Sequence, residues 1–403
     1  MRQSAGDSLT GLQKRGLRLI VLLGVVSLLA DATYEGARSI VGPYLGALGA
    51  SAAVVGVVAG MGELAGYGLR LVFGSLADRT RRYWLIAISG YVINLAAVPL
   101  LALAGRWESA ALLVLLERAG KAVRAPARDA ILSHAAAAVG RGWGFGLHEA
   151  LDQIGAVLGP LLVAWVLKSG GSYSRAFVTL AAPALCALAV LGWARASYPN
   201  PRDLERRAPA LETVGLPRVF WLYLGAAGLL AAGYADFALL AYHLERARLA
   251  PSDWIALLYA GAMGLDALAA LAFGRWFDRA GIRVLALTSL IASPFAGLVV
   301  LGGRSAAVLG LALWGLGMGA QESVLRAAVA SLAPAERRAA AYGLFQAGFG
   351  LSWFLGSAAM GLLYGISKPA LAAFSLLTQL AAAWLFLLAA KQGPGGPKAR
   401  HKT

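Results

Sequence analysis

Residues 74–83 read GSLADRTRRY, and residues 274–283 read GRWFDRAGIR. Both stretches place a glycine four residues before an Asp-Arg pair, and they lie 200 residues apart. A second pair of stretches, FGLHEA from Phe145 and YGLFQA from Tyr342, repeats at an offset of 197 residues. Two independent matches at nearly the same offset indicate that the chain consists of two related halves, as duplicated membrane proteins do.

Around these repeats the sequence is strongly apolar. Of its 403 residues, 59% are hydrophobic and only 14% are charged, and the mean hydropathy is +0.68. A soluble domain carries about 25% charged residues. Twelve segments approach the length of about 20 apolar residues that crosses a bilayer, and they predict an all-α integral membrane protein. The twelve are 17–47, 52–77, 83–104, 109–136, 142–167, 174–195, 219–247, 252–276, 283–302, 305–331, 339–366 and 370–390.

The formal net charge of +16 has two explanations, nucleic-acid binding or an excess of Lys and Arg on the cytoplasmic side of a membrane. With both termini inside, 22 Lys and Arg residues fall on the cytoplasmic side and seven on the outer side. This asymmetry predicts a multi-pass protein of the cell (inner or plasma) membrane with cytoplasmic termini. It also argues against a nucleic-acid partner. A single cysteine, Cys186, excludes a disulfide scaffold.

One polar stretch divides the chain. Residues 196–217 contain four prolines and six charged residues, and they have the composition of a linker. We therefore expect an N-terminal six-helix bundle at 1–197, a cytoplasmic linker at 198–217 and a C-terminal six-helix bundle at 218–391. The tail, 392–403, has no apolar periodicity, and we expect it to be disordered.

The stretch at 74–83 resembles the loop motif G-x-L-A-D-R-x-G-R-R of the major facilitator superfamily (MFS). Arg81 stands where the motif has glycine and Tyr83 where it ends in arginine, whereas the second copy keeps glycine at Gly281. The resemblance covers nearly the whole chain and implies two pseudo-symmetric six-helix bundles that work by alternating access. The loop-motif residues to which it assigns a gating role are Gly74, Asp78, Arg79, Arg82, Gly274, Asp278 and Arg279.

Two further elements are similar to MFS patterns. Gly155, Gly159 and Pro160 match part of a G-x-x-x-G-P element that the superfamily associates with antiporter-type exporters. Arg118 matches a fourth-helix arginine, although the residues around it differ. The family pattern also implies a gate at the end of segment 109–136. There we expect Arg128 and Asp129, with Asp129 paired to Arg79 or Arg82.

Charged residues inside the predicted segments are the main candidates for function, because each costs about 2.5–3.5 kcal/mol at the membrane centre. We count ten acidic and seven basic residues. The first segment carries Asp31, Tyr34, Glu35 and Arg38 on one helical face. This face is either the wall of a cavity with a protonatable acid, or the seat of a buried Glu35–Arg38 pair that only fixes the helix.

Segment 109–136 carries a stripe of four cations, Arg118, Lys121, Arg124 and Arg128. They either bind an anion or are neutralised by acids on neighbouring helices. Segment 142–167 adds three more candidates for proton transfer, and the remaining candidates are isolated acids. Those three and the isolated acids are His148, Glu149, Asp152, Glu63, Asp236 and Glu322. No metal-ligand spacing accompanies them, so we expect no metal site.

These observations favour a monomeric secondary transporter that moves a small solute across the lipid bilayer. Proton-coupled export is the first hypothesis, because titratable acids lie in the membrane. No phosphate loop, dinucleotide motif or nucleophile elbow is present, which argues against an ATP-driven pump, a cofactor or an enzyme. One alternative is an importer or uniporter of an organic anion, held by Arg38, Lys121 and Arg124. A remoter alternative is a receptor that keeps the fold without transport.

Overall fold

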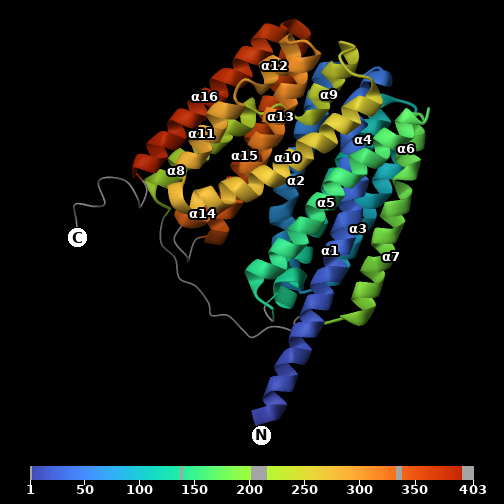
Figure 1. The fold of residues 1–403 in the computed structure, drawn as a ribbon, viewed down its shortest axis with the longest axis vertical. Coiled ribbons are helices and arrows are strands. Elements are labelled where there is room, and N and C mark those ends of the chain that lie inside the picture. The colour runs from blue at the N-terminus through green and yellow to red at the C-terminus, as the bar shows by residue number, and fades with distance from the viewer. Residues whose placement is uncertain (1, 137–138, 201–215, 333–337, 393–403) are drawn as a thin grey trace. The chain divides into compact units, whose positions relative to one another are not determined.

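The computed structural model describes residues 2–136, 139–200, 216–332 and 338–392, and these ranges contain helices and short connections without any strand (Figure 1). The helices up to the linker are α1 (Arg2–Ala47), α2 (Ala52–Thr80), α3 (Tyr83–Leu100), η1 (Leu101–Leu103), α4 (Trp107–Ala136), α5 (Arg141–Lys168), α6 (Tyr173–Thr179) and α7 (Ala181–Ser197). Those after it are α8 (Arg218–Gly233), α9 (Phe237–Arg246), α10 (Ser252–Ala280), α11 (Arg283–Ala292), α12 (Phe295–Leu301), α13 (Arg304–Ala320), η3 (Gln321–Leu325), α14 (Arg326–Leu332), α15 (Arg338–Ile366) and α16 (Lys368–Gln392).

Eleven helical stretches of the described chain are long and apolar enough to cross a membrane. Several of them join two consecutive helices, as α8 and α9 do in Arg218–Arg246. The twelfth expected segment corresponds to α4, which has sufficient length, 30 residues, but carries the charged stripe. The predicted twelve-segment helical fold is therefore confirmed, and α4 differs from the others only in composition.

Large apolar side chains also cover much of the outer surface. Trp165, Leu185 and Leu268 are 65%, 66% and 66% exposed, and each lies within a stretch long enough to span. A soluble protein rarely leaves many such side chains in water, because each buried methylene contributes about 0.8 kcal/mol. Their exposure is the expected surface of a helix that faces lipid.

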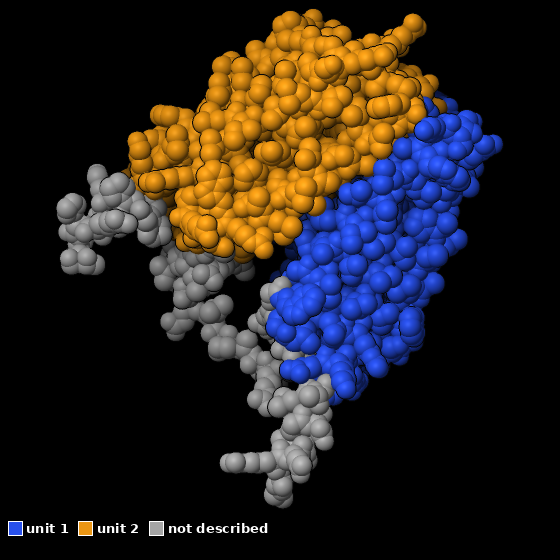
Figure 2. All heavy atoms as spheres, viewed as in Figure 1, with its two compact units in different colours: residues 1–37, 68–210 blue, residues 38–67, 211–403 orange. Residues whose placement is uncertain are grey.

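The described chain forms two compact units that are each discontinuous in sequence (Figure 2). Unit 1 comprises 1–37 and 68–210, and unit 2 comprises 38–67 and 211–403. The sequence predicts a division at the linker, whereas the units place 38–67 with the C-terminal helices. Residues 201–215 of that linker and 393–403 of the tail lie outside the described residues.

Glycines explain why 38–67 belongs to unit 2. A Cβ atom at Gly42 of α1 would collide with the carbonyl oxygen of Ala238 on α9. A Cβ at Gly56 of α2 would lie 2.5 Å from the carbonyl oxygen of Ser357 on α15. Because glycine has no side chain, these backbones approach each other more closely than any other residue would allow.

The internal repeat reappears as packing. In unit 1, a Cβ at Gly159 of α5 would collide with the carbonyl oxygen of Ala32 on α1. In unit 2, a Cβ at Gly356 of α15 would collide with that of Ala232 on α8. The two glycines lie 197 residues apart and the two alanines 200 residues apart. The offsets found in the sequence therefore mark the same helix-to-helix contact in each unit.

One position of the loop motif has the same backbone φ in both copies although the residue differs. Arg81 has a φ of 60°, and its counterpart Gly281 also has a φ of 60°. This left-handed region suits glycine and costs an L-residue with a side chain roughly 1–2 kcal/mol. The turn after α2 therefore keeps the shape that glycine favours although arginine occupies it.

We predict that Arg81→Gly raises the free energy of unfolding by about 0.5–1 kcal/mol, because the relief of backbone strain exceeds the entropy that glycine loses. The reverse change, Gly281→Arg, should lower it by about 1–3 kcal/mol, because Gly281 combines a φ of 60° with a ψ of −147°, a conformation that is nearly confined to glycine. Thermal unfolding of both purified variants in detergent measures the effect. A stabilised Gly281→Arg protein would contradict the assignment of strain to this turn.

Candidate functional site

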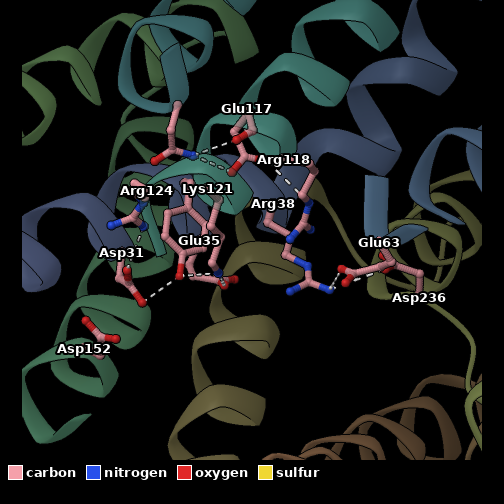
Figure 3. Close-up of polar contacts among 12 residues, drawn as sticks. Asp31, Glu35, Arg38, Glu63, Glu117, Arg118, Lys121, Arg124, Asp152 and Asp236 are labelled. Atoms are coloured by element: carbon pink, nitrogen blue, oxygen red, sulfur yellow. Dashed lines mark hydrogen bonds and ion pairs between the residues drawn. The ribbon is translucent and has the colours of Figure 1, made fainter. Parts of the chain in front are cut away.

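The basic stripe of α4 lies against carboxylates of α1, α4 and α5 in unit 1 (Figure 3). Every one of the four cations has a carboxylate within ion-pair distance. The pairs are Arg118 Nε with Glu117 Oε2 at 3.4 Å, Lys121 Nζ with Glu35 Oε1 at 3.9 Å, Arg124 Nη2 with Asp31 Oδ1 at 3.7 Å, and Arg128 with Asp129 Oδ1 at 2.9 Å and with Asp152 Oδ2 at 3.8 Å. The structure thus brings together eight of the charged residues that the sequence analysis names, and it adds Glu117 to them.

Tyr34 connects two of these pairs. Its hydroxyl group donates a hydrogen bond to Asp31 Oδ2 at 2.7 Å and accepts one from Lys121 Nζ at 2.5 Å. The ammonium of Lys121 also lies 3.8 Å from the centroid of the Tyr34 ring. A continuous polar chain therefore runs from Glu35 through Lys121, Tyr34 and Asp31 to Arg124 (Figure 3).

Arg124 is the most deeply buried member, with a side chain that is 1% exposed. Its guanidinium carbon lies 4.3 Å from the centroid of the Tyr91 ring, a cation–π contact. None of its three guanidinium nitrogens has a hydrogen-bond partner, and neither does Asp31 Oδ1. The Arg124–Asp31 pair is therefore held by charge attraction alone, an expensive arrangement away from water.

Glu117 has a structural partner that the sequence analysis missed. Asn94 of α3 donates through Nδ2 to Glu117 Oε1 at 2.8 Å and to the Glu117 carbonyl oxygen at 2.9 Å. A Cβ at Gly90 would lie only 2.5 Å from the amide nitrogen of Arg124, so α3 and α4 are in close contact here. The signal for Asn94 was available, since a lone amide in an apolar segment needs a partner.

The other end of the stripe involves α5. His148 Nε2 lies 3.2 Å from Ser27 Oγ, and Arg128 Nη1 donates to the same hydroxyl group at 3.3 Å. His148 is buried, whereas Glu149, the next residue, is exposed. Of the two predicted acids of α5, Asp152 is the one that reaches the basic stripe in a described ion pair.

Unit 2 contains a second charged cluster. Arg38 Nη2 lies 3.4 Å from Glu63 Oε1 and 3.3 Å from Asp236 Oδ2 (Figure 3). Asp236 also accepts a hydrogen bond from the amide of Ala238 at 3.0 Å and so caps the N-terminus of α9. Arg38 thus joins α1, α2 and the break between α8 and α9.

The predicted gating residues occupy the ends of helices. A Cβ atom at Gly74 would lie 3.7 Å from Pro126 of α4, and one at Gly274 would lie 4.0 Å from Ser323 of η3, so neither glycine is required by close packing. Asp129 pairs with its neighbour Arg128, and no ion pair among the described residues joins it to Arg79 or Arg82 as expected. The exposed members are Arg79, Arg82, Asp278 and Arg279, and the side chain of Asp78 lies outside the described part.

Gly155 and Gly159 have a packing role that also positions the site. A Cβ at either would collide with a carbonyl oxygen of α1, that of Leu28 or that of Ala32. These contacts flank Asp31, so they bring the acid-bearing face of α1 against α5. Pro160 directly follows in the buried face of α5.

The C-terminal helices offer fewer charges. Glu322 is exposed and lies in η3, a π-helical turn between α13 and α14. Such turns are rare and occur often at functional sites. At an offset of 200 residues, η3 corresponds to the part of α4 that carries Lys121 and Arg124. Among the described residues, no group of three His, Cys, Asp or Glu side chains is arranged to hold a metal ion.

Comparison with known proteins settles the family. The Major Facilitator Superfamily matches residues 23–251 and 249–403 of the chain. The chain belongs to this superfamily. It is therefore a multi-pass membrane transporter of the MFS and not an enzyme.

Relatives and solved structures agree with this assignment. An uncharacterized protein of Mycobacterium tuberculosis is 44% identical over 372 residues, 91% of each chain. The multidrug resistance protein MdtH of Yersinia pestis is 32% identical over 172 residues, 43% of this chain and 41% of its own length. The crystal structure of the nucleoside transporter NupG superposes with a TM-score of 0.73 at 15% identity. It covers 91% of this chain and 100% of its own, a likeness that concerns the fold alone.

We predict that Gly159→Ala lowers the free energy of unfolding of this MFS protein by about 1–3 kcal/mol, because the added methyl group forces α5 away from α1. Gly146, on the same helix, has no atom within 4 Å of the place that a Cβ would occupy, and it serves as the matched control. Gly146→Ala should be neutral or stabilising by about 0.5–1 kcal/mol. Thermal unfolding in detergent measures both, and equal effects would refute the α1–α5 contact.

Proposed function

We propose that this MFS transporter exports a small solute in exchange for protons, with the coupling acids in the α1–α4–α5 cluster of unit 1. The observation that carries the proposal is the set of carboxylates held beside the α4 cations inside a membrane-spanning unit. A charge in the membrane is expensive and marks functional sites by default. The chain has no ATP-binding motif, so an ion gradient is the available source of energy.

The distances within the cluster divide its acids into two groups. Asp129 lies 2.9 Å from Arg128, and Glu117 accepts a 2.8 Å hydrogen bond from Asn94; both are at the usual length of charge-assisted hydrogen bonds. Asp31 lies 3.7 Å from Arg124 but accepts a 2.7 Å hydrogen bond from Tyr34, whereas Glu35 and Asp152 lie 3.9 Å and 3.8 Å from their cations. We assign the coupling to Glu35 and Asp152, because a loose pair loses less when a proton replaces the cation.

Protonation would act by changing pair partners. A proton on Glu35 removes the charge that attracts Lys121, and a proton on Asp152 removes one of the two charges near Arg128. Each change alters the stability of one conformation relative to another, which is how a bound ligand shifts an equilibrium. His148, Glu149 and Glu322 belong to the same proposal as residues on proton routes.

Export rather than import has two supports. Gly155, Gly159 and Pro160 resemble the antiporter element, and MdtH, related over 43% of the chain, is called a multidrug resistance protein. The anion-importer alternative needs cations without acidic neighbours. Arg38, Lys121 and Arg124 each lie within 4 Å of a carboxylate, which leaves no excess positive charge for an anion.

The charge distribution between segments supports cytoplasmic termini in the inner membrane, and the repeat supports halves that move as the gate opens on alternate sides. In this proposal the loop-motif residues Arg79, Arg82, Asp278 and Arg279 stabilise the state that is closed toward the cytoplasm. A monomer suffices, because both halves lie in one chain.

We predict that Glu35→Gln and Asp152→Asn each abolish proton-coupled flux and leave the protein folded. Everted vesicles with an acidic interior should lose their pH gradient when a transported solute is added, and these variants should retain it. A panel of lipophilic cations, organic anions and sugars supplies the solutes. Unfolding temperatures within a few degrees of the wild type would show that the fold is intact.

The matched control for this experiment is Glu108→Gln. Glu108 is exposed at the start of α4 and pairs with Arg106 at 2.9 Å, outside the cluster. This variant should behave as the wild type does. Undiminished gradient collapse in both Glu35→Gln and Asp152→Asn would overturn the assignment of the coupling acids.

A further inference from the structure

The accessible point of the polar chain in unit 1 is Lys121. Its side chain is 24% exposed, whereas those of Asp31, Glu35 and Arg124 are 9%, 8% and 1% exposed. Tyr34 is equally buried, with 4% of its surface exposed. A solute that reaches this cluster therefore meets the ammonium of Lys121 first.

The surroundings of that ammonium have the composition of a binding site for a cation. The Tyr34 ring centroid lies 3.8 Å from Nζ, the Tyr34 hydroxyl accepts a hydrogen bond from Nζ at 2.5 Å, and a Glu35 carboxylate oxygen lies 3.9 Å from Nζ. An aromatic face, a hydroxyl acceptor and a carboxylate are the groups that recognise an ammonium ion. None of these three groups carries a positive charge. If Lys121 moved away, none of them would attract an anion.

The charges around the site give the same result. Asp31, Glu35, Lys121 and Arg124 form the core of the chain, and together they are neutral. When Lys121 leaves, two carboxylates remain beside one guanidinium, and the site carries one negative charge. A cation restores neutrality, whereas an anion would add a second uncompensated charge in a buried place.

The two central cations differ in their freedom to leave. Arg124 is fixed over the Tyr91 ring and almost completely buried. The ammonium of Lys121 lies at the end of a flexible four-carbon side chain, so it can move away without moving the helix. Lys121 can therefore vacate the site while Arg124 stays beside Asp31.

We propose that Lys121 is a tethered occupant of a binding site for an organic ammonium ion, and that a substrate amine displaces it from Tyr34 and Glu35. This inference rests on the proposed export function and names its substrate class. Between transport events the lysine ammonium fills the site beside Glu35. The substrate brings a second positive charge of the same kind, so the two compete for one site.

Competition makes a prediction that is opposite to that for a lysine that binds substrate. Removal of the tethered ammonium in Lys121→Met should tighten the binding of an amine roughly tenfold. In this variant nothing competes with the amine, so every molecule has a vacant site. Tyr34→Leu removes the aromatic face and should abolish binding. Tyr34→Phe keeps that face and should retain most of it.

The test uses benzylammonium, benzyl alcohol and benzoate, which share a ring and differ in charge, on the full-length purified protein. Each is titrated against the unfolding temperature in detergent, which a ligand of the folded state raises. We expect benzylammonium alone to stabilise the wild type and to do so at lower concentration in Lys121→Met. If Lys121→Met does not fold, two other comparisons remain. Lys121→Arg keeps a tethered cation and should not bind the amine more tightly than the wild type does. Tyr34→Leu compared with Tyr34→Phe still tests the aromatic face of the site.

Four results would each overturn the inference. The first is stabilisation by benzoate that is lost in Lys121→Met, which would make Lys121 an anion ligand. The second is weaker amine binding in Lys121→Met, the third is stronger amine binding in Lys121→Arg, and the fourth is equal amine binding in Tyr34→Leu and Tyr34→Phe. Binding as expected, with no proton-coupled flux in vesicles, would instead reject the proposed function and leave the site standing. Proton-coupled flux of another solute without amine binding would reject only the site.

Discussion

The structure of unit 1 depends on one constraint, the cost of a charge that is kept from water. The α4 stripe places four cations on one helical face, and no membrane helix can present such a face to lipid. In the structure this face of α4 lies against carboxylates of α1 and α5. The positions of α1 and α5 around α4 then follow from the need to bring those carboxylates within ion-pair distance.

The spacing of residues was enough to predict the helices and the two charged faces. The cations of α4 recur every three or four residues, and the acids of α1 do the same, so each set had to lie on one side of its helix. The gating role that the family resemblance implies for the antiporter-like glycines stays a prediction. Their contribution in the structure is the contact with α1, which the family resemblance alone did not reveal.

The ion pairs between different helices could not be predicted from the sequence, because they depend on how each helix is rotated and how closely the helices approach. The alternatives for Arg38 included a pair with Glu35 of the preceding helical turn, yet its described partners are Glu63 and Asp236, 25 and 198 residues distant. Glu149 and Asp152 share a helix face in projection, but the described ion pair with α4 is made by Asp152. Small residues such as Gly42 and Gly155 allow these helices to approach closely, and their effect appears only when a second backbone lies beside them.

The division of the chain at 37/38 and at 67/68 has a mechanical consequence. Two unbroken helices, α1 and α2, each begin in one compact unit and end in the other. Any rotation of one unit against the other must be taken up as bending or torsion within these two rods, since neither has a loop at the crossing point. In α2 the crossing lies between Gly66 and Gly68. A Cβ atom at either glycine would meet nothing within 4 Å, so no side-chain contact at these two positions opposes bending of the helix.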